Sequence, residues 1–199
     1  MRASDRVSDP AAAPPGAGVT GCAGRGPARP PARLIALIGF MAAGKSTVGA
    51  RLARSLGWRF IDVDREIERR TGRSIPDLFR DPGEPAFRAL ESELTAALLT
   101  EDHAVLALGG GWAAQPGALE SVPPAARTVW LRVSAAEAER RAAAAPAARP
   151  LLAGVEPGAA AALLRRREAA YGRADFHVEV DHRTPEEIVL EIQRLLTID

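Results

Sequence analysis

Cysteine and histidine are scarce in this chain, and their scarcity limits the metal and redox chemistry it can carry. The 199 residues include one cysteine, Cys22, and three histidines. A lone cysteine excludes a disulfide framework and a cysteine-rich zinc site. No two histidines stand four residues apart, so the sequence does not indicate a histidine metal site on a helix.

Long apolar runs and a strong charge bias are also lacking. No apolar stretch approaches the ~18 residues that a helix needs to cross a bilayer. Charged residues make up 26% of the chain and the net charge is +1, so no basic stripe of the kind that binds nucleic acid stands out. We therefore expect neither nucleic acid nor a membrane among the partners.

Lysine occurs only once. Lysine and arginine together number 26, yet Lys45 is the single lysine, and asparagine does not occur at all. Alanine is abundant, as is typical of a GC-rich coding sequence. Because arginine stands at every other fixed positive position, the remaining lysine is a candidate for chemistry that arginine does not supply.

The composition divides the chain into an extension and one domain. Residues 1–32 are rich in Pro, Gly and Ala with almost no large apolar side chains, and such a segment cannot bury enough surface to offset its ordering entropy. We predict a disordered extension or an over-called start site, with a targeting or interaction role as the alternative. Residues 33–199 are long enough for one domain with a self-sufficient core, and we expect a cytoplasmic protein.

From Arg33 onward, short apolar runs alternate with helical patterns. Strands are predicted at residues 34–39, 60–64, 104–108, 128–133 and 177–180. Helices are predicted at 45–56, 64–70, 85–100 and 158–171. Three more are predicted with Ser74, Ser134 and Thr184 as their N-caps, the last of them running to Leu196. This alternation predicts an α/β domain of three layers, with a parallel five-stranded sheet covered on both faces.

The loop between the first predicted strand and helix fits the phosphate-binding pattern G-x-x-x-x-G-K-[ST]. It runs Gly39-Phe-Met-Ala-Ala-Gly44-Lys45-Ser46. Backbone N–H groups at a helix N-terminus favour phosphate, the lysine reaches the β- and γ-phosphates, and the serine hydroxyl ligates Mg²⁺. The sequence thus predicts a P-loop NTPase fold whose nucleotide site comprises Gly39, Ala42, Ala43, Gly44, Lys45, Ser46 and Thr47. The alternative, a chance glycine turn, is disfavoured by the flanking elements and by the sole lysine.

Two aspartates lie at the carboxyl end of the second predicted strand. Asp62 and Asp64 are two residues apart, so as strand residues both carboxylates leave one face at the carboxyl end, where ligands bind in an open α/β sheet. One carboxylate can hold the water shell of a metal ion, and the other can accept a hydroxyl proton and orient a nucleophile. The alternative is that Asp64 only caps the following helix.

Further motifs follow in a fixed order. They are TGRSIPDLF (71–79), GEPAFRALE (83–91), LGGGWA (108–113), WLRVSAAEAERR (130–141), RPLL (149–152) and the R-x-x-x-Y of Arg167 and Tyr171. Together with the aspartate pair, they resemble the shikimate kinase family in order and spacing. The resemblance covers the whole chain except the extension.

The resemblance implies a role for each matching position. Asp62 corresponds to the carboxylate on the metal side, and Asp64 to the group that binds the shikimate hydroxyls and acts as the base or orienting group. The resemblance further implies that Arg88 and Arg167 bind the substrate carboxylate, and that the substrate ring lies beside Gly109, Gly110 and Gly111. It also implies that Arg149 lies in a lid that closes over the phosphates, and that Arg141 and Pro185 lie on either side of the adenine ring. Lys45, Asp64 and Arg149 are the implied catalytic residues.

The three site arginines each have a simpler interpretation. Arg88 can be a solvated helix residue or pair with Glu91 one turn on, and Arg149 can be an ordinary loop arginine. Arg167 is one of three consecutive arginines, and only its spacing to Tyr171 selects it. The chain also departs from the family pattern at two places. Ala42 replaces a usual loop glycine, which matters if its φ is positive, and the lid segment is poor in polar residues.

We therefore predict a monomeric, Mg²⁺-dependent kinase that transfers the γ-phosphoryl group of ATP to the 3-hydroxyl of shikimate, in aromatic amino-acid biosynthesis. One alternative is a kinase for another small polyol acid such as gluconate. A second is a nucleotide-gated binding protein that keeps the fold without turnover. The paired arginines and the TGRSIPDLF block favour shikimate, and the full set of implied catalytic groups disfavours a protein without turnover.

Overall fold

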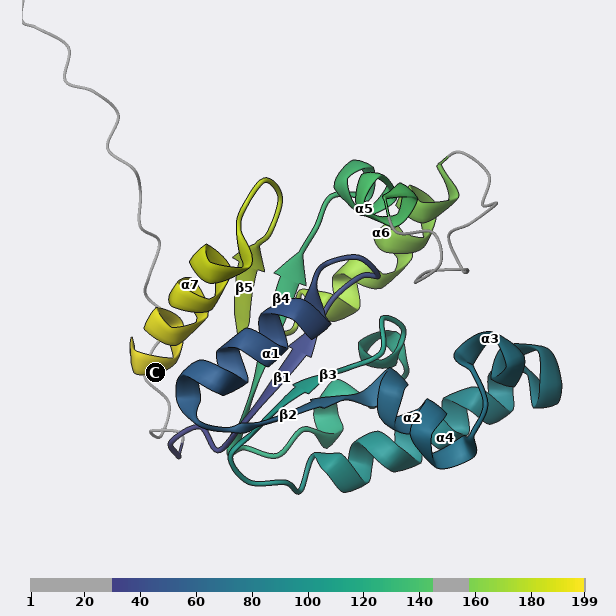
Figure 1. Ribbon diagram of the computed structural model, residues 1–199, viewed down its shortest axis with the longest axis horizontal. Helices are drawn as coiled ribbons and strands as arrows, with labels where there is room; N and C mark the ends of the chain where they lie inside the picture. The colour runs from purple at the N-terminus through teal and green to yellow at the C-terminus, as the bar shows by residue number, and fades with distance from the viewer. Residues whose placement is uncertain (1–29, 145–157, 199) are drawn as a thin grey trace, which may run out of the picture.

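The centre of the computed structural model, which describes residues 30–144 and 158–198, is a parallel five-stranded sheet (Figure 1). The strands are β1 (Leu34–Ile38), β2 (Arg59–Asp62), β3 (Ala104–Ala107), β4 (Ala126–Arg132) and β5 (Phe176–Glu179). Their spatial order is β2-β3-β1-β4-β5, so β3 inserts between the first two strands of the chain. The predicted fold class is confirmed.

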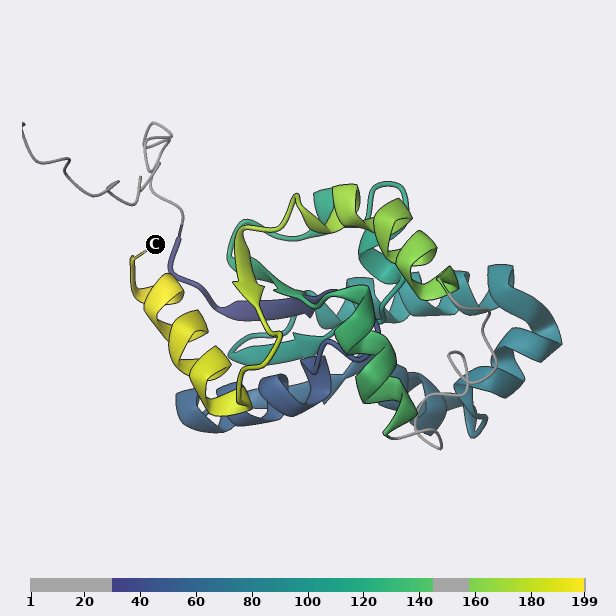
Figure 2. The same ribbon diagram turned by 90° about the horizontal axis from the view of Figure 1, so that it is seen from above.

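Helices cover both faces of the sheet. They are α1 (Lys45–Leu56), α2 (Val63–Thr71), α3 (Ile75–Leu78), α4 (Glu84–Leu98), α5 (Ala135–Ala143), α6 (Ala159–Tyr171) and α7 (Pro185–Ile198), with the short segments η1 (Phe79–Gly83), η2 (Trp112–Ala114) and η3 (Leu119–Ser121). α1 and α7 pack against each other on one face, and α6 lies on the opposite face (Figures 1 and 2). α2, α3 and α4 pack together at one side of the molecule (Figure 1).

The middle strands are buried because helices cover them on both sides. Every residue of β1 and β3 is buried, as expected of parallel strands whose sequences are continuous apolar runs. Ile35, Leu37 and Leu106 are among the largest fully buried side chains. Each such side chain contributes about 1.5–3 kcal/mol through burial, so the sheet is a firm support for the loops at its carboxyl edge.

Three predicted helix caps are present. The Ser74 and Ser134 hydroxyls accept hydrogen bonds from backbone N–H groups three residues on, at 3.3 and 3.2 Å. At the start of α7, the Thr184 hydroxyl accepts from the Glu187 N–H at 3.3 Å, and the Glu187 carboxylate accepts from the Thr184 N–H at 2.8 Å. These reciprocal bonds satisfy N–H groups that the first helical turn leaves without partners.

The aspartate pair does not lie as predicted. β2 ends at Asp62, and its carboxylate accepts a hydrogen bond from the Arg65 N–H at 3.3 Å as the N-cap of α2. Asp64 consequently lies in the first turn of α2. The prediction that both carboxylates leave one face of a strand was wrong, because the cap turns the chain into a helix two residues early. The alternative that Asp64 is the cap was also wrong.

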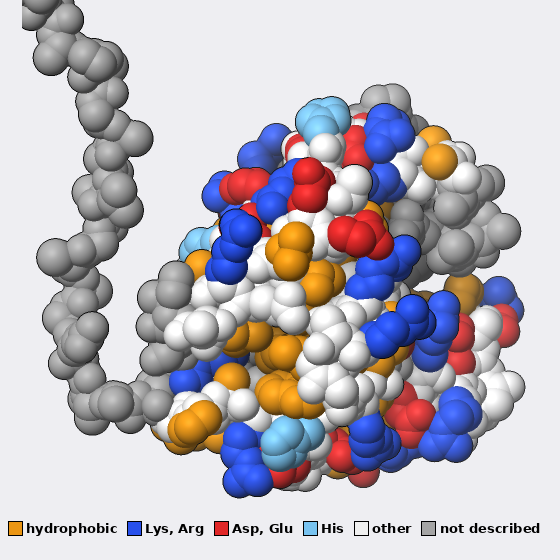
Figure 3. Space-filling view, turned by 60° about the vertical axis from the view of Figure 1, so that its left-hand side comes forward, with side chains coloured by type: hydrophobic (Ala, Val, Ile, Leu, Met, Phe, Trp, Pro, Cys, Tyr) orange, Lys and Arg blue, Asp and Glu red, His pale blue; other side chains and the backbone are white. Residues whose placement is uncertain are grey.

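The surface carries charges of both signs. On the face in Figure 3, hydrophobic side chains gather in the central part, and acidic and basic side chains are interspersed around them. Within residues 30–144 and 158–198, no helix has the length and apolar character needed to cross a membrane.

Candidate active site at the carboxyl edge of the sheet

The phosphate-binding loop lies between β1 and α1. Gly39 has φ +136°, and a Cβ atom there would lie 2.6 Å from the Leu131 carbonyl oxygen, so only glycine fits. The Lys45 ammonium folds back over the loop and donates to the carbonyl oxygens of Gly39 and Phe40, at 2.8 and 3.1 Å. The single lysine of the chain thus has its charge at the N-terminus of α1, where anions are favoured.

Ala42 occupies a left-handed conformation in this loop. Its φ is +64° and the residue is buried. A Cβ-bearing residue pays about 1–2 kcal/mol for this conformation, so the loop carries strain that glycine would avoid. The Ala42 carbonyl accepts from the Arg141 guanidinium at 3.3 Å, and the same side chain donates to the Val180 carbonyl at 2.7 Å. Arg141 therefore ties the loop to the chain after β5.

Ser46 and Asp62 meet beside the loop. The Ser46 hydroxyl donates to the second carboxylate oxygen of Asp62 at 2.5 Å. The resulting pair combines a hydroxyl and a carboxylate, which are oxygen donors of the kind that Mg²⁺ prefers. Among the residues described, no cluster of three or more His, Cys, Asp or Glu side chains forms a metal site. Mg²⁺ does not need such a cluster, because it binds through one or two carboxylates, water and substrate phosphates.

Asp64 lies partly buried in the first turn of α2, among other charged side chains. Burial raises its pKa to about 6. The carboxylates of Asp62, Glu91 and Glu68 add to this shift, and the Lys45 ammonium opposes it. A carboxyl group with a pKa near 6 is ionised at neutral pH and accepts a proton more readily than an ordinary aspartate.

The glycine segment after β3 packs directly against charged side chains. A Cβ atom on Gly109 would lie 1.9 Å from a Glu91 carboxylate oxygen and 3.1 Å from an Asp64 carboxylate oxygen. On Gly111 it would lie 2.7 Å from the Arg88 guanidinium nitrogens. The absence of side chains at these two positions therefore lets Asp64, Arg88 and Glu91 approach the backbone.

Arg88 is held on several sides by neighbours on α4 and η1. Its guanidinium donates to Glu91 at 2.7 Å and to Glu84 at 3.1 Å, and its side chain is 23% exposed. The guanidinium carbon also lies 5.5 Å from the Phe79 ring centre and 5.3 Å from that of Phe87. Arg88 pairs with Glu91, as the alternative predicted, and its guanidinium also lies beside Gly111.

Glu91 lies buried within the candidate site, although the sequence indicated it only as an ion-pair partner for Arg88. Its side chain is 1% exposed, and burial raises its pKa while the Arg88 hydrogen bond opposes that shift. One carboxylate oxygen accepts from Arg88 and from the Gln115 amide at 2.8 Å, and the other has no hydrogen-bond partner among the described residues. The spacing of three residues from Arg88 is the signal that indicates this role.

Arg167 is the member of its arginine run that faces the site. Arg165 and Arg166 are exposed, whereas Arg167 is partly buried and donates to the Gly110 carbonyl at 3.1 Å. The buried Tyr171 hydroxyl donates to the same oxygen. The register chosen from the Arg167–Tyr171 spacing agrees with this geometry. Arg149 and the predicted lid lie outside the described residues.

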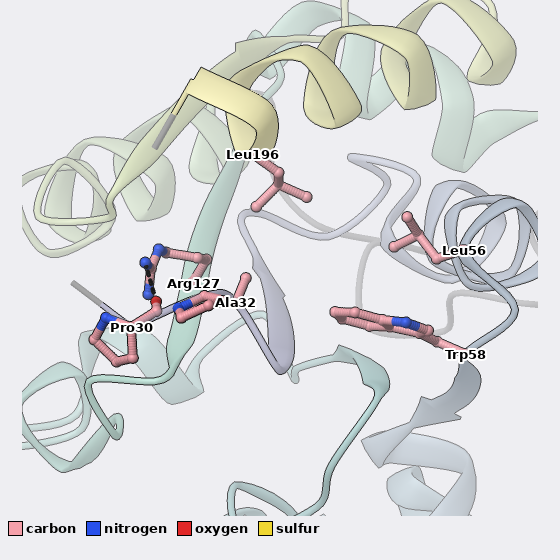
Figure 4. A pocket seen from close by; sticks show the side chains of 7 residues that line it. Pro30, Ala32, Leu56, Trp58, Arg127 and Leu196 are labelled. Atoms are coloured by element: carbon pink, nitrogen blue, oxygen red, sulfur yellow. Dashed lines mark hydrogen bonds between the residues drawn. The ribbon is translucent and has the colours of Figure 1, made fainter. Parts of the chain in front are cut away.

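A separate pocket lies at the opposite end of the sheet (Figure 4). Its volume is about 410 Å³, and it is lined by Pro30, Pro31, Ala32, Leu56, Trp58, Arg127 and Leu196. The strands start at this end, whereas the phosphate-binding loop and the glycine segment follow their carboxyl ends. The pocket contains none of the predicted site residues.

Comparison with known proteins identifies the family. The family model described as shikimate kinase matches residues 41–197. A shikimate kinase from Thermus thermophilus is 44% identical over 163 residues, covering 81% of this chain and 89% of that protein. The chain belongs to the shikimate kinase family. A family member from Mycobacterium tuberculosis is 41% identical over 164 residues, covering 81% of this chain and 92% of its own length.

Solved structures of shikimate kinases superpose on the chain. The enzyme from Acinetobacter baumannii, solved in complex with shikimate, has a TM-score of 0.78 at 34% identity, with 84% of this chain and 94% of that chain covered. The enzyme from Aquifex aeolicus has a TM-score of 0.73 at 38% identity, with coverages of 82% and 96%. A gluconokinase from Sinorhizobium meliloti is more distant, with a TM-score of 0.51 at 21% identity over 85% of this chain and 93% of its own, and shows the fold alone.

Proposed function

We propose that this enzyme transfers the γ-phosphoryl group of ATP to the 3-hydroxyl of shikimate and releases 3-phosphoshikimate and ADP. The observation that carries the proposal is the meeting of three groups around Gly109–Gly111: the phosphate-binding loop with Lys45, the carboxylate of Asp64 and the guanidinium of Arg88. A phosphate site, a proton acceptor and a carboxylate-binding fork are the parts that phosphorylation of a hydroxy acid requires.

The nucleotide phosphates would lie on the loop formed by Gly39, Ala42, Ala43, Gly44, Lys45, Ser46 and Thr47. Lys45 supports this role because its ammonium lies at the N-terminus of α1 and already contacts loop carbonyls. The resemblance adds Arg149 as the lid residue that closes over the phosphates. In phosphoryl transfer such positive charges stabilise the transition state and require little covalent chemistry from the protein.

Ser46 and Asp62 would hold Mg²⁺, which would neutralise charge on the nucleotide phosphates. Their oxygen atoms already meet at 2.5 Å, and the donor types suit the ion. Asp62 is held in place by its second function as the cap of α2.

Shikimate would bind through its carboxylate to Arg88 and Arg167, and through its ring to the backbone of Gly109, Gly110 and Gly111. A planar guanidinium matches a carboxylate with two parallel hydrogen bonds. Asp64 would accept the proton of the attacking hydroxyl and aim its oxygen at the γ-phosphorus. The raised pKa of Asp64 supports proton acceptance at neutral pH.

We propose that the enzyme acts in the cytoplasm and as a monomer, the state that the family resemblance suggests. A coupled assay of ADP release tests the reaction, with shikimate, gluconate or no acceptor added. ADP release that depends on shikimate supports the proposal. A preference for gluconate would replace the substrate, and no release with either acid would favour a binding protein without turnover.

A further inference from the structure

Gly110 lies at the junction between the phosphate-binding loop and α6. A Cβ atom on Gly110 would lie 3.4 Å from the Met41 nitrogen and 3.6 Å from the Gly39 carbonyl oxygen. From the other side, the Gly110 carbonyl accepts hydrogen bonds from Arg167 and Tyr171, which are one helical turn apart on α6. Any movement of the Gly110 peptide group therefore affects both the phosphate-binding loop and α6.

The side chain of Tyr171 interacts with Arg167 and is also held by its own packing in the core. Its side chain is fully buried, and its ring packs on Trp130 with the ring centres 5.8 Å apart. Trp130 also lies 3.3 Å from the position that a Cβ atom on Gly39 would take. The phenol is therefore a rigid donor, whereas the Arg167 side chain is only partly buried and has several rotatable bonds.

We propose that Tyr171 is a positioning residue, whose hydroxyl keeps the Gly110 carbonyl satisfied so that Arg167 can leave it and bind the substrate carboxylate. This inference rests on the proposed function, in which Arg167 binds that carboxylate. A carbonyl oxygen accepts two hydrogen bonds. At Gly110 one comes from Tyr171, which stays in place, and the other comes from Arg167, which can move.

Moving Arg167 from the Gly110 carbonyl to the substrate carboxylate costs little free energy when the Tyr171 hydroxyl is present. When Arg167 moves to the substrate, the Gly110 oxygen keeps its bond from Tyr171. Without the hydroxyl, the same movement leaves an acceptor without a partner on its buried side, and the gap left by one oxygen atom is too small for water to replace it. Shikimate binding then has to offset the penalty of an unsatisfied buried group.

The variant Tyr171→Phe tests this. We expect its shikimate KM and Kd to rise by about 5- to 100-fold, the range for leaving one buried acceptor unsatisfied. ADP affinity should stay unchanged. The kcat at saturating shikimate should stay within about twofold, because the penalty is the same in the shikimate-bound ground state and in the transition state. The control Val178→Ala removes buried side-chain volume from β5 without touching Gly110. It should lower the melting temperature and leave the shikimate KM unchanged.

A double-mutant cycle separates this role from simple support of the loop. In an Arg167→Ala background no guanidinium leaves Gly110, so adding Tyr171→Phe should weaken shikimate binding no further. Equal weakening by Tyr171→Phe in both backgrounds would overturn the proposal. An unchanged shikimate KM in Tyr171→Phe, in an enzyme whose wild type releases ADP with shikimate, would overturn it as well and leave the proposed function intact.

A measurement that needs no destabilising variant uses the fact that Tyr171 is the only tyrosine in the chain. Biosynthetic incorporation of 3-fluorotyrosine therefore gives a single ¹⁹F resonance, at a ring whose hydroxyl donates to Gly110. Saturating shikimate should shift this resonance, because the oxygen that accepts from the phenol loses its second donor. A resonance that stays in place while shikimate is bound and turned over would show that Arg167 does not leave Gly110.

Discussion

Lys45 is the only side-chain amine in the protein, so an amine-selective acylating reagent has two targets, this residue and the α-amino group. Acylation removes the charge and the ammonium donors that contact the loop at Gly39 and Phe40. Because a preorganised charge at transferring phosphoryl groups contributes several kcal/mol, we expect inactivation to follow modification of Lys45. Mg-ATP should protect the enzyme, and shikimate alone should protect little.

Peptide mass mapping beside residual activity measures this directly. A Lys45→Arg variant is the control, since it keeps a positive charge and should show one acylated site fewer. Full activity in protein that is quantitatively acylated at Lys45 would remove this residue from the mechanism.

The carboxylate of Asp64 can be tested by Asp64→Asn, which keeps the size of the side chain but accepts no proton. Turnover at saturating shikimate should fall by ~100-fold or more, in line with the contribution of a general base. The KM for ATP should stay near that of the wild type. Asp102→Asn, at the surface pair with Arg33, is the matched control. Turnover above half the wild-type value would exclude the role given to Asp64.

The same substitution should stabilise the fold. The pKa of Asp64 is raised from 3.8 to about 6 in the folded protein, so the folded state binds the proton more tightly than the unfolded state. The free energy of unfolding therefore falls as pH rises from about 4 through 6, by about 2–3 kcal/mol.

Asn does not ionise, so Asp64→Asn should raise the melting temperature at pH 8 and lose this advantage toward pH 4. Thermal unfolding of both proteins across that range is the measurement. An advantage that grows toward acid would mean that the charge of Asp64 stabilises the fold. A gain in stability together with a loss of turnover is typical of groups kept for function.

At the scale of elements, side chains of α4 and η1 together hold the Arg88 guanidinium in one position. Arg88 donates to Glu84 and Glu91 and lies over Phe79 and Phe87. Lysine keeps the charge but cannot form the planar fork that matches a carboxylate with two parallel hydrogen bonds. Arg88→Lys should therefore raise the shikimate KM by about 5- to 100-fold, equivalent to about 1–3 kcal/mol, and leave the ATP KM unchanged.

Arg80→Lys is the control for Arg88, because Arg80 is exposed and pairs with Asp77 on the same side of the molecule. Steady-state kinetics with each substrate varied in turn separate the two effects. An unchanged shikimate KM in Arg88→Lys would make Arg88 a structural partner of Glu91.

The sequence predicted the bounds of a helix or strand well where residues next to both of its ends mark where it begins and stops. The bounds of α1 agree with the prediction, because glycine precedes and follows its amphipathic run. The β2–α2 junction was missed because an alternating run of apolar and acidic residues fits a strand and a helix cap equally well. In the structure Asp62 caps α2, so β2 ends there and Asp64 lies on the helix.

The site was predictable only in its local parts. The phosphate-binding loop is one continuous motif, so its geometry follows from the sequence. The bond from Tyr171 to Gly110 joins residues 61 positions apart, and no local pattern encodes it. The buried carboxylate of Glu91 likewise depends on packing that only the folded chain shows.

On the scale of the whole molecule, the two ends of the sheet differ in what they contain. The carboxyl edge holds the phosphate-binding loop, Asp64 and the glycine segment. At the other end Arg127 is 1% exposed, and its guanidinium donates to the carbonyl oxygens of Pro30 and Pro124 at 2.7 and 2.9 Å (Figure 4). A fully buried guanidinium at the start of β4 thus binds Pro30, a residue that the sequence assigned to the extension.

Two truncated proteins test whether this contact belongs to the domain. One begins at Pro30 and the other at Arg33, so they differ only in the three residues that line the pocket beside Arg127. The shorter protein loses the Pro30 acceptor of a buried charged donor, which contributes about 1–3 kcal/mol. We therefore expect it to unfold at a lower temperature than the longer one, with kcat and both KM values equal below the transition, because the active site lies at the opposite edge. Thermal unfolding and ADP-release kinetics of the pair are the measurements. Equal melting temperatures would place the domain boundary at Arg33, and altered kinetics would show that the base of the sheet is coupled to the site.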